Sequence, residues 1–391
     1  MNKIFSRISF ILMICLIVIA FVVGFRLGED TEQKTILNNL PEGIDFSIVN
    51  DVWDQLEDKY LNQLDHEKMV YGAAKGIAES LGDPYTVFYD PEESQTFQES
   101  ISGSFEGIGM EVGVKDGVLT IIAPIEGSPA KLAGLLSGDK IIKIENEFAS
   151  DMTIDEAVSK MRGKRDTVVV LTIFRDGWKD VKEFEITRAI INIPSVEVKI
   201  LDNNIAHLTI YQFNENLTLQ FINAANEIVS HGAKKIVLDL RNNPGGLLDK
   251  AQEVAGWFLE KGTLVLIEEY SDGVQKEYKA KGNAYFKDYP IVVLVDGGTA
   301  SGAEILAASL KENNTKVQLV GEKTFGKGLV QEALEMENNS FLKITTAKWL
   351  TPLGNEINKI GINPDIEIKM PEDATNTDPQ LDKAIELIKK Y

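Results

Sequence analysis

The sequence predicts a mixed α/β fold that carries a β-rich module, follows a helical segment and starts with a transmembrane helix. Three observations lead to this prediction. From residue 190 onward, strand patterns alternate with amphipathic helix patterns, which is typical of a mixed sheet with helical crossovers. Residues 105–188 instead hold short β patterns separated by turn residues. Residues 8–25 are apolar almost throughout, which is typical of a membrane span.

The apolar run from Ile8 to Phe25 is the predicted anchor. As a helix it would be roughly 27 Å long, close to the thickness of a bilayer's hydrocarbon core. Because Lys3 and Arg7 precede the run, residues 1–7 are expected to stay cytoplasmic and the rest to lie outside. A cleaved secretion signal is the alternative, but its apolar core is usually shorter, and no small-x-small cleavage site follows here. We therefore expect a single-pass protein of the cell membrane with extracytoplasmic domains.

Length, charge and cysteine content limit the partners and cofactors. The 391 residues are enough for two or three folded units. The formal net charge of −20 argues against nucleic acid, since a phosphate-binding surface needs clustered Lys and Arg. The only cysteine, Cys15, lies in the apolar run, so the outside part forms no disulfide and binds no zinc through thiolates. We expect no metal and no cofactor.

Helix patterns dominate residues 47–104, which follow a polar tether at 26–46. One helix is expected from Ser47 to Tyr60 and a second from His66 to Leu81, which ends at a glycine. Two helices alone bury little, so they are expected to pack on another domain or on a second subunit. Together with a final helix near the C-terminus they suggest a homodimer, although intramolecular packing explains them equally well.

The β-rich module spans residues 105–188, and helical patterns near Ser128–Gly134 and Thr153–Arg162 interrupt its strands. The expected strands are Gly107–Val114, Val118–Pro124, Lys140–Ile144, Val168–Phe174 and Lys182–Thr187. This size and order are typical of a compact binding module.

The α/β core covers residues 189–370, and residues 371–391 add an acidic linker and a last helix, Gln380–Lys390. The expected core elements, strand and helix in turn, are Ile205–Phe213, Leu217–His231, Lys235–Leu240, Leu248–Leu259, Ile291–Val295 and Ser301–Asn313. A short polar segment joins the last strand, Ile291–Val295, to the helix Ser301–Asn313, and it carries the first candidate site.

Ser301 is the first candidate catalytic group. In IVVLVDGGTASGAEILAASL, residues 291–310, an apolar strand runs into a Gly-Gly turn and Ser301 stands at the start of a helix. Free backbone N–H groups and the positive end of the helix dipole meet there, and both favour an oxyanion. Alternatively, Thr299 or Ser301 merely caps the helix, and on this segment alone the cap is the better explanation.

Two further glycine-rich segments offer the other parts of a hydrolytic site. IVLDLRNNPGG, residues 236–246, ends a strand in adjacent glycines whose N–H groups can point at a ligand. In GEKTFGKGLVQ, Lys327 lies between two glycines and Gln331 follows four residues later, with an amide oxygen that could hold the amine. As a base, Lys327 must lose its proton near neutral pH, which costs roughly 4 kcal/mol and requires burial. Taken alone, an ordinary turn and a solvated loop lysine explain these segments better.

The three histidines, His66, His207 and His231, offer no better base. None lies in a glycine-rich loop or near a carboxylate at a suggestive place in the sequence, so structural roles are expected for all three. A catalytic dyad would therefore use lysine as its base.

Taken together, the segments resemble those of the tail-specific, or carboxyl-terminal processing, serine peptidases of the S41 type, which carry a PDZ domain. The similarity covers residues 47–390. It rests on eight segments in one order: GAAKGIAESLGDPYTVFYDPEE, FEGIGM, GSPAKLAGLLSGDKIIKIEN, MRGK, DLRNNPGG, TASGAE, TFGKGLVQ and TPLGNEINKIGINPD. The resemblance implies a mixed-sheet core of the ClpP and crotonase kind. It also implies that Ser301 is the nucleophile, Lys327 the base and Gln331 the residue that orients the lysine.

The resemblance further implies an oxyanion hole made by the N–H groups of Gly302 and of Gly245 or Gly246. Two residues depart from the family pattern, because relatives usually have alanine at the position of Gly302 and asparagine at that of Asp296. We expect a less rigid oxyanion hole at Gly302. We also expect the charge of Asp296 to raise the pKa of a nearby lysine and to slow the enzyme at neutral pH.

The β-rich module resembles the PDZ domain of this family. The resemblance implies that Gly107, Ile108, Gly109 and Met110 form the loop whose N–H groups bind a peptide's C-terminal carboxylate, while the peptide adds to the sheet as a strand. Arg162 is expected to link the module to the peptidase core, although an exposed arginine at a helix end explains it nearly as well.

The expected function is endoproteolysis of extracytoplasmic proteins that have a free C-terminus docked on the PDZ module. Two other classes stay open. A binding scaffold on an inactive peptidase fold is disfavoured by the intact set of Ser301, Lys327 and Gln331. A relative of the acyl-CoA hydratases would explain the glycine loops, but it gives no reason for the PDZ module or for the outside location.

Overall fold

The computed structural model describes residues 45–391, apart from residues 116, 126, 203 and 372–376. The predicted cytoplasmic start and anchor, residues 1–25, lie outside the described residues, as does nearly all of the tether at 26–46. Within the described residues, no helix is long and apolar enough to cross a membrane. The chain divides after Val70 into two units, which are described one at a time.

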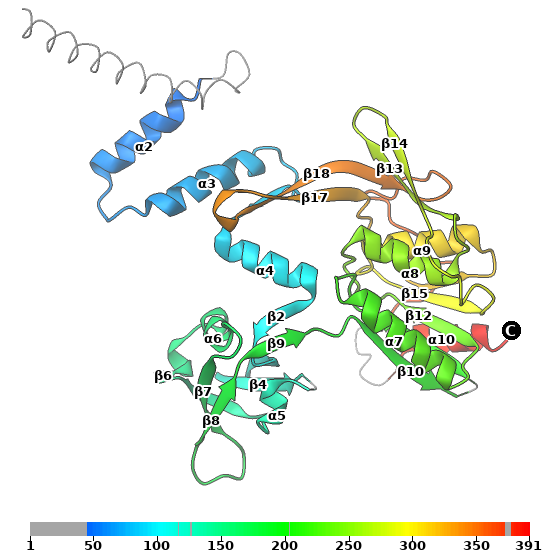
Figure 1. Ribbon diagram of the computed structural model, residues 1–391, viewed down its shortest axis with the longest axis horizontal. Helices are drawn as coiled ribbons and strands as arrows, with labels where there is room; N and C mark the ends of the chain where they lie inside the picture. The colour runs from blue at the N-terminus through cyan, green and yellow to red at the C-terminus, as the bar shows by residue number, and fades with distance from the viewer. Residues whose placement is uncertain (1–44, 116, 126, 203, 372–376) are drawn as a thin grey trace, which may run out of the picture. The chain divides into compact units, whose positions relative to one another are not determined.

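The first unit contains α2 (Ser47–Lys59) and the start of α3 (His66–Glu79), both close to their predicted bounds (Figure 1). Trp53 stacks on the His66 ring at 5.7 Å, and the Nε2 of His66 lies 2.6 Å from Glu57. His66 therefore has the structural role expected of it. The apolar side chains that follow helical spacing on α2 stay exposed, namely Ile48, Val49, Val52 and Leu56.

The second unit begins with the rest of α3, strand β1 (Val87–Tyr89) and helix α4 (Pro91–Ser102). Neither β1 nor α4 is among the predicted elements, although the start of α4 carries a complete capping box. The Asp90 carboxylate accepts the N–H groups of Glu92 and Glu93, and the Glu93 carboxylate accepts the N–H of Asp90.

The β-rich module is a sheet of order β3-β4-β5-β7-β8, with β6 added to β5. Its strands are β3 (Met110–Lys115), β4 (Val118–Pro124), β5 (Lys140–Ile144), β6 (Glu147–Phe148), β7 (Val168–Phe174) and β8 (Lys182–Thr187), and its helices are α5 (Pro129–Leu132) and α6 (Ile154–Met161). The predicted strand Gly107–Val114 is broken at residues 108 and 109; the other predicted strands are present as expected. Strands β2 (Ser104–Gly107) and β9 (Ala189–Asn192) pair where the chain enters and leaves the module.

The α/β core contains a second six-stranded sheet of order β10-β11-β12-β15-β16-β19, in which only the edge strand β10 runs antiparallel to its neighbour. Its strands are β10 (Val196–Leu201), β11 (Ile205–Ile210), β12 (Lys235–Asp239), β15 (Ile291–Val295), β16 (Gln318–Gly321) and β19 (Ile366–Glu367). Its helices are α7 (Leu217–Ser230), α8 (Leu248–Phe258), α9 (Gly302–Asn313) and α10 (Pro379–Ile388). This arrangement is the mixed α/β core that the sequence predicts.

Alternation along the strands explains why helices cover both faces of this sheet. On β12, Ile236 and Leu238 join the large apolar cluster formed with α7, α8 and α9. Val237, between them, joins the cluster formed with α10. The strands are therefore buried on both sides, as the continuous apolar runs in the sequence require.

A third sheet was not expected from the sequence. It is antiparallel, has the order β1-β18-β13-β14, and includes β17 as a further partner of β18 (Figure 1). Its long strands are β13 (Leu264–Tyr270), β14 (Gln275–Lys279), β17 (Leu329–Glu335) and β18 (Phe341–Leu350). Several of these strands alternate only weakly in polarity and are half-buried or exposed, which is why the apolar pattern did not mark them.

Candidate active site

Three loops follow three neighbouring parallel strands. Strands β12, β15 and β16 are adjacent in the sheet, and residues 240–246, 296–301 and 322–328 follow their carboxyl ends. The carboxyl ends of parallel strands meet at one edge, where open α/β sheets place their ligands. The topology therefore brings the three glycine-rich segments of the sequence together.

Ser301 is held in a left-handed backbone conformation directly before α9. Its φ of 51° and ψ of −119° lie in a region that residues other than glycine rarely adopt. Ser301 is the N-cap residue of α9 and Glu304 accepts its N–H, but an ordinary helix cap has extended backbone, so capping alone does not account for this conformation. The turn is held to the neighbouring loop, because the Thr299 hydroxyl donates to the Leu240 carbonyl at 2.8 Å and the Ala300 N–H donates to the Asn243 carbonyl at 2.9 Å.

Glu304 joins the loop of Ser301 to the loop of Lys327. Its fully buried carboxylate accepts the N–H groups of Ser301 at 3.0 Å, Gly326 at 2.8 Å and Lys327 at 2.9 Å, together with the Thr324 hydroxyl. One side chain thus fixes the backbone at both candidate catalytic residues. Glu304 was not among the predicted residues, although a Glu three residues after an N-cap Ser is the pattern of a capping box.

Ser301, Lys327 and Gln331 line one cavity of about 500 Å³. The Nζ of Lys327 lies 5.0 Å from the centre of the Tyr85 ring. None of the three histidines lines this cavity. Its apolar lining includes Phe213, Leu248, Ile305, Val330 and Trp349. The arrangement therefore places a hydroxyl, an amine and an amide against a largely apolar space.

The environment of Lys327 makes its amine easier to deprotonate. Burial lowers the pKa of Lys327 below the ordinary lysine range, and the positive charge of Lys343 lowers it further. Lys343 lines the same cavity, with its Nζ 2.8 Å from the Tyr89 hydroxyl and 5.9 Å from the centre of the Phe97 ring. No motif in the sequence marked Lys343, because its position on β18 became known only with the third sheet.

The NPGG loop lies against the predicted nucleophile. A Cβ atom on Gly245, whose φ is 91°, would lie 2.7 Å from the Cβ of Ser301 and 2.7 Å from the N of Gly302, so only glycine fits there. Gly302 itself has ordinary room, since a Cβ there would meet its nearest neighbours at 3.6 Å. Sterically, the site would also accept an alanine at residue 302.

The two loop glycines differ in the use of their N–H groups. The Gly245 N–H donates to the Asn243 side-chain oxygen at 2.8 Å inside the protein. The bridge between Phe213 and Gly246 uses the Phe213 N–H, which donates to the Gly245 carbonyl, and the Leu247 N–H, which donates to the Phe213 carbonyl. The Gly246 N–H takes no part in this bridge.

The expected effect of Asp296 on the lysine is wrong. Its Oδ1 accepts the N–H groups of Asn242, Gly298 and Thr299 at 2.9 to 3.0 Å, so the carboxylate closes the Gly-Gly turn. Asp296 is not among the residues that line the cavity, and the pKa of Lys327 is lowered rather than raised.

A partly buried ion network centres on Arg241, which directly precedes the NNPGG segment. Arg241 donates to Asp239 and, through its other side, to Asp378 at the start of α10, with Nη2 2.7 Å and 2.8 Å from the two carboxylates. The Nε2 of His207 lies 3.0 Å from the same Asp239 carboxylate. Burial acts to raise the pKa of Asp239, but the hydrogen bonds from His207 and Arg241 outweigh it and lower the pKa to about 2. No motif in the sequence indicated that His207 pairs with a carboxylate.

A cavity of about 80 Å³ lies at the predicted carboxylate loop of the β-rich module, lined by Phe105, Ile108, Gly109, Met110, Val158, Met161 and Arg162. The Ile108 carbonyl accepts the Ala130 N–H, and the Gly109 carbonyl accepts the Ser128 hydroxyl, so both carbonyls face α5. The carbonyl and N–H of a trans peptide point in opposite directions, so the N–H groups of Gly109 and Met110 point away from α5.

Arg162 lies at the end of α6, next to α4. Its guanidinium forms an ion pair with Glu99 of α4 and lies 4.9 Å above the Phe105 ring. Arg162 lines the cavity of the module, while Ile101, two residues after Glu99, lines the cavity of Ser301. Gly107, in contrast, lies in β2 and is not among the residues that line the module's cavity.

Comparisons with known proteins identify the family. Residues 204–368 match the family model of peptidase family S41, residues 120–175 that of the PDZ domain, and residues 27–93 that of the N-terminal domain of the activating protease CtpB. The carboxy-terminal processing protease CtpA of Bacillus subtilis is 39% identical over 94% of this chain and 78% of its own length. CtpB of the same organism is 37% identical over 83% and 68%. The chain belongs to the carboxy-terminal processing peptidases of family S41.

Membership of this S41 family makes the chain a serine-type peptidase with a PDZ domain, and it confirms the resemblance read from the sequence motifs. A solved S41 protease from Bacteroides fragilis supports the fold, with a TM-score of 0.55, 18% identity, and coverage of 90% of this chain and 99% of that one. The S41 match contains Ser301, Lys327 and Gln331, and the PDZ match begins after the predicted carboxylate loop.

Proposed function

We propose that the protein is a membrane-anchored, extracytoplasmic endopeptidase that uses Ser301 and Lys327 as a catalytic dyad. In this proposal its substrates are proteins whose free C-terminus docks on the PDZ domain. The observation that carries the proposal is the cavity shared by Ser301 and Lys327, where burial and Lys343 lower the pKa of the Lys327 amine. A lysine that loses its proton readily is the base that such a dyad needs.

The chemical steps follow from the residues in the cavity. Neutral Lys327 takes the proton of the Ser301 hydroxyl as the oxygen attacks the peptide carbonyl, and the ammonium then gives that proton to the leaving amine. Water later attacks the acyl-enzyme, with Lys327 again taking the proton. Gln331 holds the Lys327 amine through its amide oxygen. The buried N–H of Gly245 is already used, which favours Gly246 over Gly245 as the loop donor of the oxyanion hole, with Gly302 as the second donor.

Substrate recognition is assigned to the PDZ domain. The N–H groups of Gly109 and Met110 point away from α5, and both residues line the module's cavity. Strand β3 is an edge strand to which a peptide could add. The ion pair between Arg162 and Glu99 supports a role for Arg162 in coupling peptide binding to the core. Through Glu99, α4 contacts a residue that lines the module's cavity, and through Ile101 it lines the cavity of Ser301.

Location and assembly belong to the proposal as well. The apolar run at 8–25, with cations before it, supports a single-pass anchor in the cell membrane, and a cleaved secretion signal is the alternative. The exposed apolar residues of α2 favour a homodimer, since an unpartnered apolar helix face usually meets a partner.

Replacing Ser301 by alanine tests the proposed chemistry. The Ser301→Ala protein should cleave an unstructured peptide with an apolar C-terminus at least about a thousandfold more slowly than wild type, because the nucleophile is gone. Mass spectrometry of the products measures the rate. Binding of the peptide, followed by fluorescence anisotropy, should be unchanged, because the PDZ domain is intact. Cleavage by the variant at the wild-type rate would contradict the assignment.

A further inference from the structure

We propose that Asp83, far from the catalytic loops in the sequence, fixes the orientation of the Gln331 amide through Thr345. The chain of hydrogen bonds turns the amide oxygen toward Lys327. Asp83 and Thr345 would then be positioning residues for the catalytic base. This inference rests on the Ser301 and Lys327 dyad of the proposed function. It adds that the turn between α3 and β1, which contains Asp83, supports this dyad.

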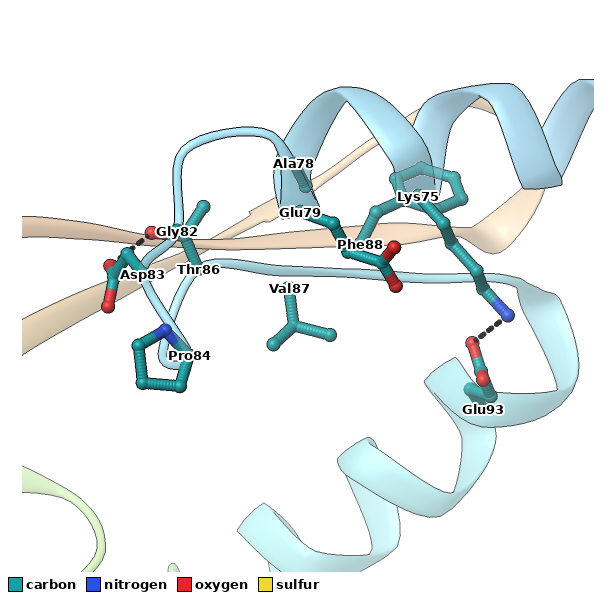
Figure 2. A pocket seen from close by; sticks show the side chains of 10 residues that line it. All are labelled: Lys75, Ala78, Glu79, Gly82, Asp83, Pro84, Thr86, Val87, Phe88 and Glu93. Carbon is teal, nitrogen blue, oxygen red and sulfur yellow. Dashed lines mark hydrogen bonds and ion pairs between the residues drawn. The ribbon is translucent and has the colours of Figure 1, made fainter.

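Asp83 organises the turn between α3 and β1. Its Oδ1 accepts the N–H of Tyr85 at 3.0 Å, and its Oδ2 accepts the Thr86 hydroxyl at 2.7 Å. Figure 2 shows Asp83 and Thr86 joined across this turn, which also lines a separate cavity of about 440 Å³ with Lys75. Thr86 is only 5% exposed, so this end of the turn is packed into the protein, while Asp83 is half-buried.

The turn is bonded to strand β18 at Thr345. The Thr345 N–H donates to the Thr86 hydroxyl oxygen at 3.1 Å, and the Thr345 hydroxyl is hydrogen-bonded to the Asp83 carboxylate. Burial acts to raise the pKa of Asp83, but the hydrogen bonds from Thr345, Thr86 and the N–H groups of the turn outweigh it, so the pKa lies below the ordinary aspartate range. Asp83 is therefore ionised at neutral pH.

A β-bulge sets Gln331 opposite Thr345. Along the β17–β18 pair, Val330 lies opposite Ala347 but Gln331 lies opposite Thr345, so one residue of β18, Thr346, is left over. The Nε2 of Gln331 then lies 3.4 Å from the Thr345 hydroxyl oxygen. The bulge turns the Gln331 side chain into the cavity that holds Lys327.

The Asp83 carboxylate sets the direction of donation along the hydrogen bonds that join Gln331, Thr345 and Asp83. An ionised carboxylate only accepts hydrogen bonds, so Thr345 must give its single hydroxyl proton to Asp83. The Thr345 oxygen can then only accept, and the Gln331 amide must offer it the NH₂ group. The amide oxygen of Gln331 is left facing the cavity, as an acceptor for Lys327. Without Asp83 or the Thr345 hydroxyl, the amide could rotate by half a turn and present NH₂ to the amine, where it would repel the ammonium or occupy the lone pair that neutral Lys327 needs as a base.

The same turn contacts the base from a second side. The Tyr85 ring, whose N–H is held by Asp83, lies 5.0 Å from the Lys327 Nζ. Two further ionisable groups act near Lys327, namely Lys343 on β18 and Glu304 on α9, which accepts the Lys327 N–H. The effect of Asp83 can be separated from theirs, because its hydrogen bonds reach Gln331 only through Thr345.

A double-mutant cycle tests the inference. Thr345→Val removes the hydroxyl with little change of volume and leaves the backbone bond to Thr86; we expect kcat to fall about tenfold with KM unchanged. Thr345→Ser restores the hydroxyl and should return kcat to near the wild-type value. In a Gln331→Ala background, Thr345→Val should cause no further loss, because Thr345 acts only through Gln331. Thr346→Val makes the same change one residue away and serves as the matched control.

Three outcomes would overturn the inference. They are wild-type kcat in Thr345→Val, equal losses in Thr345→Val and Thr346→Val, and a full additional loss in the Gln331→Ala background. Because misfolding also lowers kcat, the melting temperature and the labelling of Ser301 by an acylating probe are measured for each variant. The Ser301→Ala protein is assayed beside them. Activity in that variant would overturn the dyad itself, whereas an inactive Ser301→Ala with a fully active Thr345→Val overturns only the positioning roles of Asp83 and Thr345.

Discussion

The role proposed for Lys327 depends on an amine that is neutral in the folded protein near pH 7. Burial supplies the first part of the effect, and the second comes from Lys343, a cation that shares the cavity. Lys343 is held by the Tyr89 hydroxyl and by the rings of Tyr89 and Phe97. Its charge is therefore kept close to Lys327 rather than released to solvent.

Removing the charge of Lys343 should move the pH dependence of catalysis. The rate rises with pH as Lys327 loses its proton, so a higher pKa at Lys327 moves this rise to higher pH. In Lys343→Met the repulsion is gone, the pKa of Lys327 rises, and kcat/KM at pH 7 should fall roughly threefold to tenfold, with recovery in more alkaline buffer. A full pH profile of kcat/KM measures the shift.

Lys343→Arg is the matched control, because it keeps the charge and should keep the wild-type profile. The alternative role for Lys343 is substrate binding, which the Lys343→Met variant would reveal. In that case Lys343→Met would raise KM for substrates with acidic side chains and leave the pH profile where it was.

Residues in motifs were predictable, and residues that support them were not. Ser301, Lys327 and Gln331 stand in glycine-rich segments whose chemistry is local, and the structure brings all three to one cavity. Glu304 and Lys343 act through contacts with other elements. Their environment depends on how the loops and the third sheet meet, which no local pattern specifies.

At the scale of elements, the apolar pattern predicted the buried strands and missed the exposed ones. Strand β15 is buried along its whole length and was predicted with its observed bounds. Strands β14 and β17 are largely exposed, so polar residues occupy them and the alternation is weak. The same reason hid the bulge at Gln331, since a bulge depends on pairing with a partner strand.

The start of helix α10 supports the NPGG loop through one side chain with two functions. Asp378 caps the helix by accepting the Leu381 N–H at 2.9 Å, and it pairs with Arg241, which follows β12. The helix covers one face of the core sheet with Ala384 and Ile388. Its first turn is therefore bonded to Arg241, which directly precedes the NNPGG segment.

Substitutions of Asp378 separate these two functions. Asp378→Asn keeps a good cap but loses the charge, and it should lower the free energy of unfolding by about 1 to 2 kcal/mol. Asp378→Ala loses the cap as well and should cost about 1 kcal/mol more. Urea unfolding followed by circular dichroism measures both values. Equal stability of the two variants would show that the cap contributes nothing.

The ion pair of Asp378 also predicts a pH dependence. Burial acts to raise the pKa of Asp378, but Arg241 and the Leu381 N–H outweigh it, so the folded pKa lies below that of the unfolded chain. The stabilisation is therefore fully present above about pH 4, and it is lost as the pH falls through the folded pKa. The difference between wild type and Asp378→Asn should accordingly shrink in acid and persist at neutral pH.

At the scale of the whole molecule, the order of parts along the chain was predictable, but their interdependence was not. The PDZ motif and the S41 motifs are each found in the sequence, and both families are matched. The contribution of residues 83–87 to the catalytic core was not foreseen, because it depends on β1 pairing with β18 more than 250 residues later. Long-range pairing of this kind leaves no periodic signal in either segment.

The same interdependence bears on how a docked peptide could reach the active site. Arg162 lines the PDZ cavity and pairs with Glu99, while α4 also contributes Phe97 and Ile101 to the cavity of Ser301. We propose α4 as the element through which occupancy of one cavity affects the other.

Covalent labelling of Ser301 tests the central claim most directly. A fluorophosphonate probe, which reacts with an activated serine hydroxyl, is incubated with the wild-type, Ser301→Ala and Lys327→Met proteins, and the modified residue is located by mass spectrometry. We predict one adduct, on Ser301, in the wild type, none in Ser301→Ala, and labelling at least about a hundredfold slower in Lys327→Met because the base is absent. An adduct on another residue, or labelling of Lys327→Met at the wild-type rate, would contradict the Ser301 and Lys327 dyad.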